Sequence, residues 1–300
     1  MERFWVREGQ WFKGNLHTHT TESDGAETPE RIIECYERGG YDFLALTDHE
    51  KLTRITGAHS LLLIPGEEIA VGTPEAGGRF HIVALNVQQQ IEKGQFEHPQ
   101  EVIDAVRAQG GEAIIAHPYW TGLTIRDMEP LTGFLGIEAY NSTCEYSIGK
   151  GHSLAHWDAL LARNRRVFGF AHDDAHYHFN EHRPNDAVNA YIMVKAASLS
   201  IEDIMAAIKA GEFYACSGPG QGPQILDFFV EDGFAVARTS PAKRITVVAN
   251  PGGGLGERFT ALQSPTVTEA YYKLRGRETS VRVEVVDSEG KTAWSNPIVL

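Results

Sequence analysis

Short apolar runs alternate with amphipathic stretches through the N-terminal and central parts of the chain. The apolar runs are continuous and lead into polar residues, as at residues 43–46 and 113–116. The amphipathic stretches carry apolar residues at helical spacing, such as Ile32, Ile33 and Tyr36. Strands without polar alternation that take turns with helices are typical of a parallel sheet covered on both sides. This part of the chain therefore predicts an α/β fold.

The same pattern predicts where the strands and helices lie. We expect strands over residues 11–17, 42–47, 61–64, 80–87, 113–116, 135–140, 167–171 and 189–195. We expect helices over residues 29–38, 99–109, 152–164 and 200–210. Thr28 and Pro29 suit the start of the first helix, and Gly39-Gly40 suits its end. Because several predicted strands end in polar residues, closure into a barrel that collects them on one face is favoured.

Helical periodicity disappears after Gly218-Pro219-Gly220. Beyond this point we expect strands over residues 225–231, 235–239, 244–250, 270–274, 280–286 and 293–299. Strands joined by turns in this way predict an antiparallel β-sandwich of immunoglobulin-like size. The chain therefore divides into residues 1–218 and residues 219–300. The second part lacks comparable His/Asp clusters, so we interpret it as a non-catalytic appendage.

Histidines and carboxylates follow the predicted strands where the strands end. His17 and His19 are two residues apart, so in an extended segment both imidazoles lie on one side and can reach one metal ion. Asp48 and His49 end the next predicted strand. In a parallel strand–helix–strand unit both strand ends open on the same face. We therefore expect these groups to meet.

Each candidate also has an ordinary structural explanation. A lone histidine in an apolar strand, such as His81, is more often a satisfied core residue. Acidic residues in a loop, as Glu67 and Glu68 are expected to be, are usually solvated. What favours a metal site is that such residues occur together at five separate predicted strand ends.

The candidate ligands are imidazoles and carboxylates, without thiolates: His17, His19, Asp24, His49, Glu68, His81, His117, Asp174 and His176. Such a set suits zinc, manganese or iron, and it is larger than one tetrahedral ion requires. We therefore expect two or three divalent ions, bridged by a carboxylate and a hydroxide. Clustered ions would lower the pKa of bound water, orient the substrate and stabilise the leaving group.

Charge and cysteine usage narrow the choice of partners and compartment. The net charge of −13 disfavours general nucleic-acid affinity, which needs a basic surface. Cys35, Cys144 and Cys216 are too widely spaced for a zinc-type pair or a disulfide framework, so a reducing cytoplasm is expected. The N-terminal residues have no apolar signal-type core, and no apolar run approaches the roughly 20 residues of a membrane span. The oligomeric state is left open.

The succession of motifs closely resembles the PHP superfamily, named for polymerase and histidinol phosphatase. The matching motifs, in the family's order, are HTHT…SDG (17–25), LTDH (46–49), IPGEEI (64–69), HIVAL (81–85), AHP (116–118), IEAYN (137–141) and DDAH (173–176). The resemblance implies a distorted (β/α)7 barrel with two or three metal ions at the strand C-termini. Residues 156–176, FYACSGP (213–219) and the C-terminal strands resemble a subgroup with a β-sandwich tail. Its members are mostly phosphoesterases, and one branch hydrolyses a carbamate ester.

The resemblance also implies a role for individual residues. One ion would take His17, His19, Glu68 and Asp174; a second would take Glu68, His81 and His117; a third would take Asp24, His49 and His176. The family's spacing selects Glu68 over Glu67 and Asp174 over Asp173. Asp174 or His176 would relay a proton, and Glu138 would orient a ligand rather than bind metal. His172, His178 and His182 lie outside the implied ligand set, and we expect them in exposed loops or in contact with substrate.

We therefore expect a metal-dependent phosphoesterase that uses a metal-bridging hydroxide on a small phosphorylated molecule. A carboxylester or carbamate hydrolase on the same site is an alternative. The PHP part of a polymerase or exonuclease is another, which the net charge and the lack of a polymerase region oppose. A non-catalytic metal-binding module is the fourth interpretation, and the complete ligand set argues against it.

Overall fold

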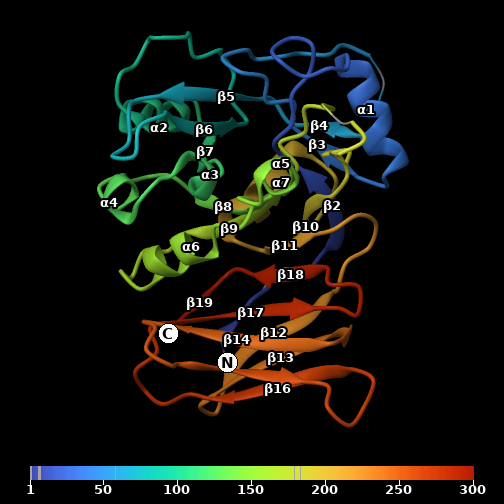
Figure 1. Ribbon diagram of the computed structural model, residues 1–300, viewed down its shortest axis with the longest axis vertical. Helices are drawn as coiled ribbons and strands as arrows, with labels where there is room; N and C mark the ends of the chain where they lie inside the picture. The colour runs from blue at the N-terminus through green and yellow to red at the C-terminus, as the bar shows by residue number, and fades with distance from the viewer. Residues whose placement is uncertain (1, 6–7, 58, 179, 183) are drawn as a thin grey trace.

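The computed structural model describes residues 2–5, 8–57, 59–178, 180–182 and 184–300, and it stacks a helix-containing part on a part built from strands (Figure 1). The start of the chain lies in the lower, all-strand part. There, β1 (Glu2–Arg3) pairs antiparallel with β12 (Ile225–Glu231). The chain then crosses into the upper part, where all the described helices lie.

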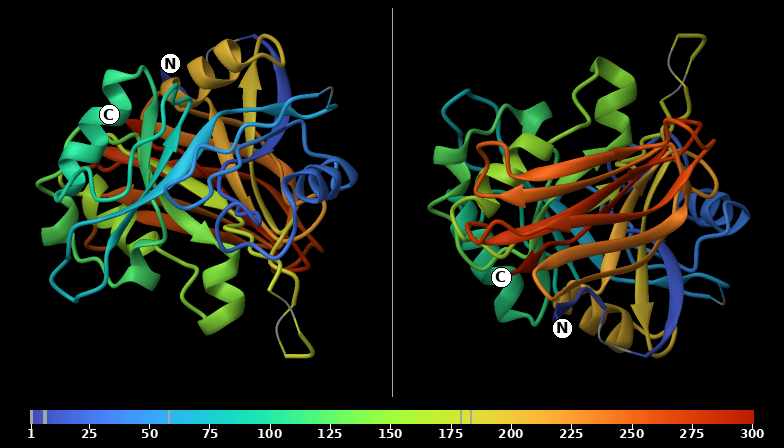
Figure 2. Two further views of the ribbon diagram at one scale, coloured as in Figure 1. Left: turned by 90° about the horizontal axis from the view of Figure 1, so that it is seen from above. Right: turned by 90° about the horizontal axis from the view of Figure 1, so that it is seen from below.

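Two sheets make up the upper part. One follows chain order: β5 (Gly66–Val71), β6 (Phe80–Leu85), β7 (Glu112–Ile115), β8 (Gly136–Asn141) and β9 (Phe168–His172). The other places its strands in a different order: β11 (Phe213–Ser217), β10 (Ala190–Ala196), β2 (Gln10–Asn15), β3 (Phe43–Leu44) and β4 (Leu62–Leu63). Strand β9 packs against β10 and β11, so the two sheets meet there. Figure 2 shows strands crossing the centre of this part and helices around its periphery.

The strands are only partly parallel. Strands β2, β3 and β4 are parallel, and so are β7, β8 and β9, as the apolar runs predict. Strand β6 is antiparallel to both β5 and β7, and β10 is antiparallel to both β2 and β11. The expectation of a parallel sheet is wrong for these strands. Residues 72–79 are too short for the crossover that a parallel β5–β6 pair would need, so these two strands form a hairpin.

Most predicted helices are present, and several short ones are added. Helix α1 (Pro29–Arg38) begins where predicted, with the Thr28 side chain accepting a hydrogen bond from the Arg31 backbone N–H. Helix α2 (Pro99–Ala108) is capped by His98 and Glu101. The remaining helices are α3 (Pro118–Thr121), α4 (Ile125–Met128), α5 (Ser142–Ile148), α6 (Leu154–Leu161) and α7 (Ile201–Ala210). The described helices include none with the length and apolar character needed to cross a bilayer.

The lower part is an antiparallel sandwich, as the sequence predicts. One sheet contains β1, β12, β13 (Phe234–Ala242) and β16 (Val267–Lys273). The facing strands are β14 (Arg244–Asn250), β15 (Gly256–Thr260), β17 (Ser280–Val286), β18 (Thr292–Ser295) and β19 (Ile298–Val299). Strands β12, β14 and β17 coincide with their predicted bounds. Strand β15, which the apolar pattern does not reveal, is largely exposed.

The two parts share one continuous sheet. Strand β11 pairs with β10 on one side and with β18 on the other. Arg282 of β17 is 2% exposed and donates two hydrogen bonds of 3.0 Å to the Asp158 carboxylate of α6. Its guanidinium also lies over the Trp157 ring. The predicted boundary at residue 218 therefore falls at the end of a strand that both parts use.

Candidate metal centre

The structure brings all nine predicted ligand residues to one place. His17, His19, His49 and His117 follow the strands β2, β3 and β7, and Asp174 and His176 follow β9, whereas Glu68 and His81 lie within the β5–β6 hairpin and Asp24 in the loop before α1. Neighbouring side chains of this set approach one another with nitrogen–oxygen distances between 3.0 and 3.9 Å. The side chains therefore form one continuous network of imidazoles and carboxylates.

Glu68 is at the centre of this network. Its side chain is 1% exposed, and five imidazole nitrogens lie 3.0–3.3 Å from its carboxylate: His17, His19 and His49 at Oε2, and His81 and His117 at Oε1. Glu67 and Glu68 lie in β5, so the expectation of a solvated loop is wrong for both. Because side chains alternate along a strand, only one of the two can face the network.

Asp174 holds the two histidines that follow β2. Its Oδ1 lies 3.0 Å from His19 Nε2 and 3.2 Å from His17 Nε2, and its Oδ2 accepts a hydrogen bond from Asn141 Nδ2. The backbone of Asp174 has a φ of 54°, in the left-handed region. The backbone N–H of His19 donates to the Ala175 carbonyl. These bonds join the ends of β2 and β9, which lie far apart in the chain.

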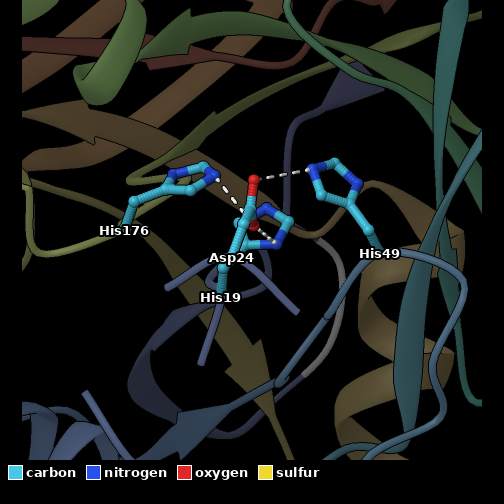
Figure 3. A group of neighbouring side chains, drawn as sticks. All are labelled: His19, Asp24, His49 and His176. Carbon is cyan, nitrogen blue, oxygen red and sulfur yellow. Dashed lines mark ion pairs between the residues drawn. The ribbon is translucent and has the colours of Figure 1, made fainter. Parts of the chain in front are cut away.

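Asp24 is the most open member of the set. Figure 3 shows its carboxylate between the rings of His49 and His176, with His19 nearby. The three oxygen–nitrogen distances are 3.6, 3.5 and 3.7 Å respectively. The Asp24 side chain is 54% exposed, so this side of the network faces solvent.

The network could hold metal ions in several groups. Ligand atoms within 4.8 Å of one another occur in His17–His19–Glu68–Asp174, in His19–Asp24–His49–His176, in His49–Glu68–His81 and in His17–Glu138–His172. The first group is the set expected for one ion, and the second contains the set expected for another. In the third, His49 stands where His117 is expected, although His117 Nε2 lies 3.3 Å from Glu68.

The electrostatics fit bound cations. Burial raises the pKa of Glu68, but the surrounding imidazoles, His17 first, lower it well below its usual range. Burial lowers the pKa of His19, but hydrogen bonds to Asp174 and Glu68 raise it to about 9. Buried His19 Nδ1 lacks a hydrogen-bond partner among the described residues. The proton on His19 occupies a lone pair that a metal ion would use, so metal binding would displace it, and the set of imidazoles and carboxylates then fits bound cations.

Glu138 lies behind the ligands. It is fully buried, and its Oε1 is 2.7 Å from His17 Nδ1 and 2.9 Å from His172 Nδ1. Its Oε2 accepts hydrogen bonds from the His117 backbone N–H and from Asn141 Nδ2. Glu138 therefore contacts the Nδ1 of His17, a predicted ligand, and the orienting role that the resemblance implies for it stays a prediction.

Two residues of this inner network were not recognised from the sequence. His172 is the last residue of β9 and is fully buried, so its expected place in an exposed loop is wrong. Extending the predicted strand by one residue would place it on the same side as Phe170. Asn141 ends β8 and joins Glu138 to Asp174 through its amide, but no local pattern indicates that role. His178 and His182 are exposed, as expected.

The carboxylates next to Glu68 and Asp174 have other partners. Burial raises the pKa of Asp173 to about 6, and its carboxylate accepts hydrogen bonds from the side chains of Tyr36 and Ser142 and from three backbone N–H groups of residues 188–190. Burial raises the pKa of Glu67 to about 7, and its Oε1 accepts a hydrogen bond from the Ile91 backbone. Through these hydrogen bonds, both carboxylates stabilise the surrounding segments of the chain.

A cavity of about 380 Å³ opens over the network. Its floor includes seven of the predicted ligands, and its remaining lining residues are Trp120, Thr143, Cys144, Ser147, Ile148 and His178. A larger cavity of about 580 Å³ lies at the junction of the two parts, beside Arg165, Phe168 and Ile298. None of the nine ligands lines it, so the smaller cavity is the one in which bound metal ions could meet a substrate.

Comparison with curated proteins finds relatives over part of the chain. No family model matches. An uncharacterised protein of Methanocaldococcus jannaschii is 30% identical over 118 residues, which are 36% of this chain and 68% of that protein. Phosphoribosyl 1,2-cyclic phosphate 1,2-diphosphodiesterase of Eggerthella lenta is 32% identical over 81 residues, or 25% of this chain and 31% of the enzyme. The 5'-3' exoribonuclease Rnm of Escherichia coli is 38% identical over 81 residues, which are 24% of this chain and 27% of the enzyme. The chain thus spans less than a third of either enzyme.

Comparison with solved structures extends over both parts. A two-domain protein from Bacteroides vulgatus, described as containing a predicted PHP-like metal-dependent phosphoesterase, aligns with 99% of this chain and 97% of its own. The TM-score is 0.51 and the sequence identity is 14%. At this identity the likeness is one of fold, and it includes the C-terminal strands.

Proposed function

Because the chain belongs to the PHP superfamily of metal-dependent phosphoesterases, we propose that it hydrolyses the phosphate ester of a small molecule with the help of two or three bound divalent metal ions. The observation that carries this proposal is the network around Glu68. Five imidazoles surround one buried carboxylate at the floor of an open cavity, and this carboxylate and its imidazoles are the chemical groups that bind divalent transition metals.

We propose that the ligands divide as the resemblance implies, around Asp174, around His81 and His117, and around Asp24, with Glu68 shared between the first two. Imidazoles and carboxylates without thiolates favour manganese, iron or zinc. When bound, such ions would lower the pKa of a water molecule that attacks phosphorus and would offset the charge of the phosphoryl oxygens. The two sheets of the upper part would then be the distorted barrel, with the ligands at one rim.

His176 is the better placed of the two residues expected to relay a proton. Its ring lines the cavity, and its Nε2 faces Asp24, which is exposed. Asp174 is buried, and its two carboxylate oxygens are hydrogen-bonded to His19 and to Asn141. A carboxylate held in this way is suited to binding a metal ion beside His17 and His19 rather than to moving a proton. We therefore assign proton transfer to His176 and metal binding to Asp174.

A small substrate fits the surface charge better than a polynucleotide does. The chain carries a net charge of −13, and the cavity lining contains neither Lys nor Arg among the described residues. Binding a polynucleotide requires several cationic contacts with successive phosphates. The relation to an exoribonuclease makes a short oligoribonucleotide the necessary comparison substrate.

The test is a substrate panel on metal-reconstituted protein. The purified chain is stripped with a chelator, loaded with manganese, iron or zinc, and offered a phosphomonoester, a phosphodiester, an aryl carbamate and an oligoribonucleotide. We expect phosphate-ester hydrolysis only after loading. Cleavage of the carbamate without cleavage of any phosphate ester would overturn the proposal, and preferential degradation of the oligoribonucleotide would replace the small substrate with RNA.

A further inference from the structure

An exposed tryptophan stands on the wall of the cavity beside two predicted ligands. Trp120 is 42% exposed, and its ring centroid lies 5.0 Å from that of His117 and 6.1 Å from that of His81. Tryptophan side chains bury some of the largest areas of any residue, with a flat surface that favours stacking on other rings. A tryptophan left open at the edge of a metal-ligand network therefore offers a binding surface.

The position of this tryptophan is fixed by its neighbours. Trp120 lies on the short helix α3, which begins directly after His117. The backbone N–H of Tyr119 donates to Ser153 Oγ at 3.1 Å, and Thr121 Oγ1 lies 3.1 Å from His117 Nδ1. Because hydrogen bonds hold the residues on both sides, the backbone that carries the indole keeps a defined place relative to the predicted ligands.

Helix α5 contributes the other apolar part of the lining. Ile148, which is 59% exposed, and Cys144 both border the cavity. The side chain of Asn141 caps this helix by accepting from the Cys144 backbone N–H, and its amide donates to Asp174. The cavity thus has a floor of imidazoles and carboxylates and an apolar lining that hydrogen bonds tie to it.

We propose that the substrate is a phosphate ester whose leaving group carries a flat aromatic ring, and that this ring stacks on Trp120. The inference rests on the proposed function and specifies its substrate class. A cavity of about 380 Å³ is near the small end of ligand pockets, which suits one phosphoryl group and a compact ring system. The described lining contains neither Lys nor Arg that could pair with a second phosphate beyond the metal-ligand floor, so the leaving group would be uncharged.

The reaction consumes one water molecule. Its oxygen forms a bond to phosphorus while the bond between phosphorus and the leaving-group oxygen breaks. One proton of the water ends on the released aromatic alcohol, and the other stays with the water oxygen on the released inorganic phosphate. Trp120 takes no part in these bond changes. Its role is to select and orient the ring, so it determines specificity rather than chemistry.

The experiment compares two substrates that differ mainly in flatness. Benzyl phosphate and cyclohexylmethyl phosphate have leaving alcohols of similar size, but only the first presents an aromatic face. We expect the metal-loaded wild type to prefer benzyl phosphate. Trp120→Ala should lower kcat/KM for benzyl phosphate by about tenfold, chiefly through KM, and should affect the cyclohexyl substrate much less. Trp120→Phe should retain most of the preference, because it keeps a ring.

Tyr119→Ala is the matched control. Tyr119 is 43% exposed on the same helix but does not line the cavity, so its loss should leave the preference unchanged. Binding of the non-hydrolysable benzylphosphonate and cyclohexylmethylphosphonate, measured by calorimetry, gives a readout that does not require turnover. Equal binding of the two phosphonates by the wild type, or an equal loss for both in Trp120→Ala, overturns the ring site. A retained phosphonate preference without hydrolysis of any phosphate ester supports the ring site and overturns the proposed activity.

Discussion

Glu138 Oε1 lies 2.7 Å from Nδ1 of His17, on a fully buried carboxylate that the cavity does not reach. Burial raises the pKa of Glu138, but His17, followed by His172, lowers it well below its usual range, so the carboxylate is ionised. An ionised acceptor at Nδ1 keeps the proton on that nitrogen. His17 Nε2, on the other side of the ring, is thereby directed toward Glu68 and Asp174, where it could bind a metal ion once its own proton is displaced.

Replacing Glu138 by Gln should therefore weaken metal binding. The amide keeps the shape but loses the charge that orients the His17 ring, and losses of such partners typically cost 10–100-fold in metal affinity. Competition with a chelator of known affinity measures the effect. Glu67→Gln is the matched control, since Glu67 is equally buried but bonds to the Ile91 backbone. Equal metal affinity in the Glu138→Gln and wild-type proteins would contradict the proposed role.

Substitutions of the neighbouring residues Asp173 and Asp174 should have different effects, one on stability and the other on metal binding. Asp174→Asn should lose metal and lower turnover by orders of magnitude while the protein remains folded, because its carboxylate faces His17 and His19. Asp173→Asn should lower the free energy of unfolding by about 3 kcal/mol, because an amide cannot satisfy all the buried donors that meet this carboxylate.

Denaturant titration and elemental analysis of both variants separate the two effects. The family's spacing only leaves Asp173 out of the ligand set, and the hydrogen bonds of its buried carboxylate add the expected loss of stability. If Asp173→Asn loses metal at full stability while Asp174→Asn binds metal normally, the ligand assignment is wrong by one residue.

Metal content and its pH dependence form a third prediction. Elemental analysis of the reconstituted protein should find two or three divalent ions per chain. Without ions, burial lowers the pKa of His19 but its bonds to Asp174 and Glu68 raise it to about 9, so the ring is protonated at neutral pH. Binding must displace this proton, and affinity should fall as the pH is lowered from 9.

Calorimetry in two buffers of different ionisation enthalpy counts the protons that metal binding releases. We expect at least one per chain at neutral pH, and metal removal should also lower the melting temperature, since the ions bind only the folded state. Fewer than one ion per chain after loading with manganese, iron and zinc in turn would exclude the cluster.

The junction between the two parts should contribute to the stability of the fold rather than to catalysis. Asp158→Asn leaves the buried guanidinium of Arg282 without its charged partner, which should cost about 3 kcal/mol. Metal content of the folded variant should be unchanged. Glu269→Gln, which breaks an exposed pair with Arg238, is the control and should cost much less, because solvent screens an exposed ion pair. Similar losses in both variants would mean that the junction pair adds nothing beyond surface charge.

Local patterns determined the elements and the ligand candidates. Apolar spacing and end signals placed α1 and α2 and three strands of the sandwich close to their observed bounds. Most of the nine ligand candidates could be read from the sequence because they lie in or shortly after a predicted strand; Asp24 lies further along a loop, and the family's spacing was needed to choose Glu68 over Glu67 and Asp174 over Asp173. Charge and residue type limited the metals to those that accept imidazole and carboxylate ligands.

Only the tertiary structure decided which partner each residue meets. His17 and Glu138 are 121 residues apart in the chain, and no spacing pattern relates them. The antiparallel direction of β6, the burial of His172 and Asp173, and the place of Trp120 on the cavity wall also depend on contacts between distant segments. Periodicity records whether a side chain prefers the interior, because burial follows from polarity and spacing. The identity of its neighbour follows from how the sheets pack. That packing is determined jointly by residues that lie far apart along the chain.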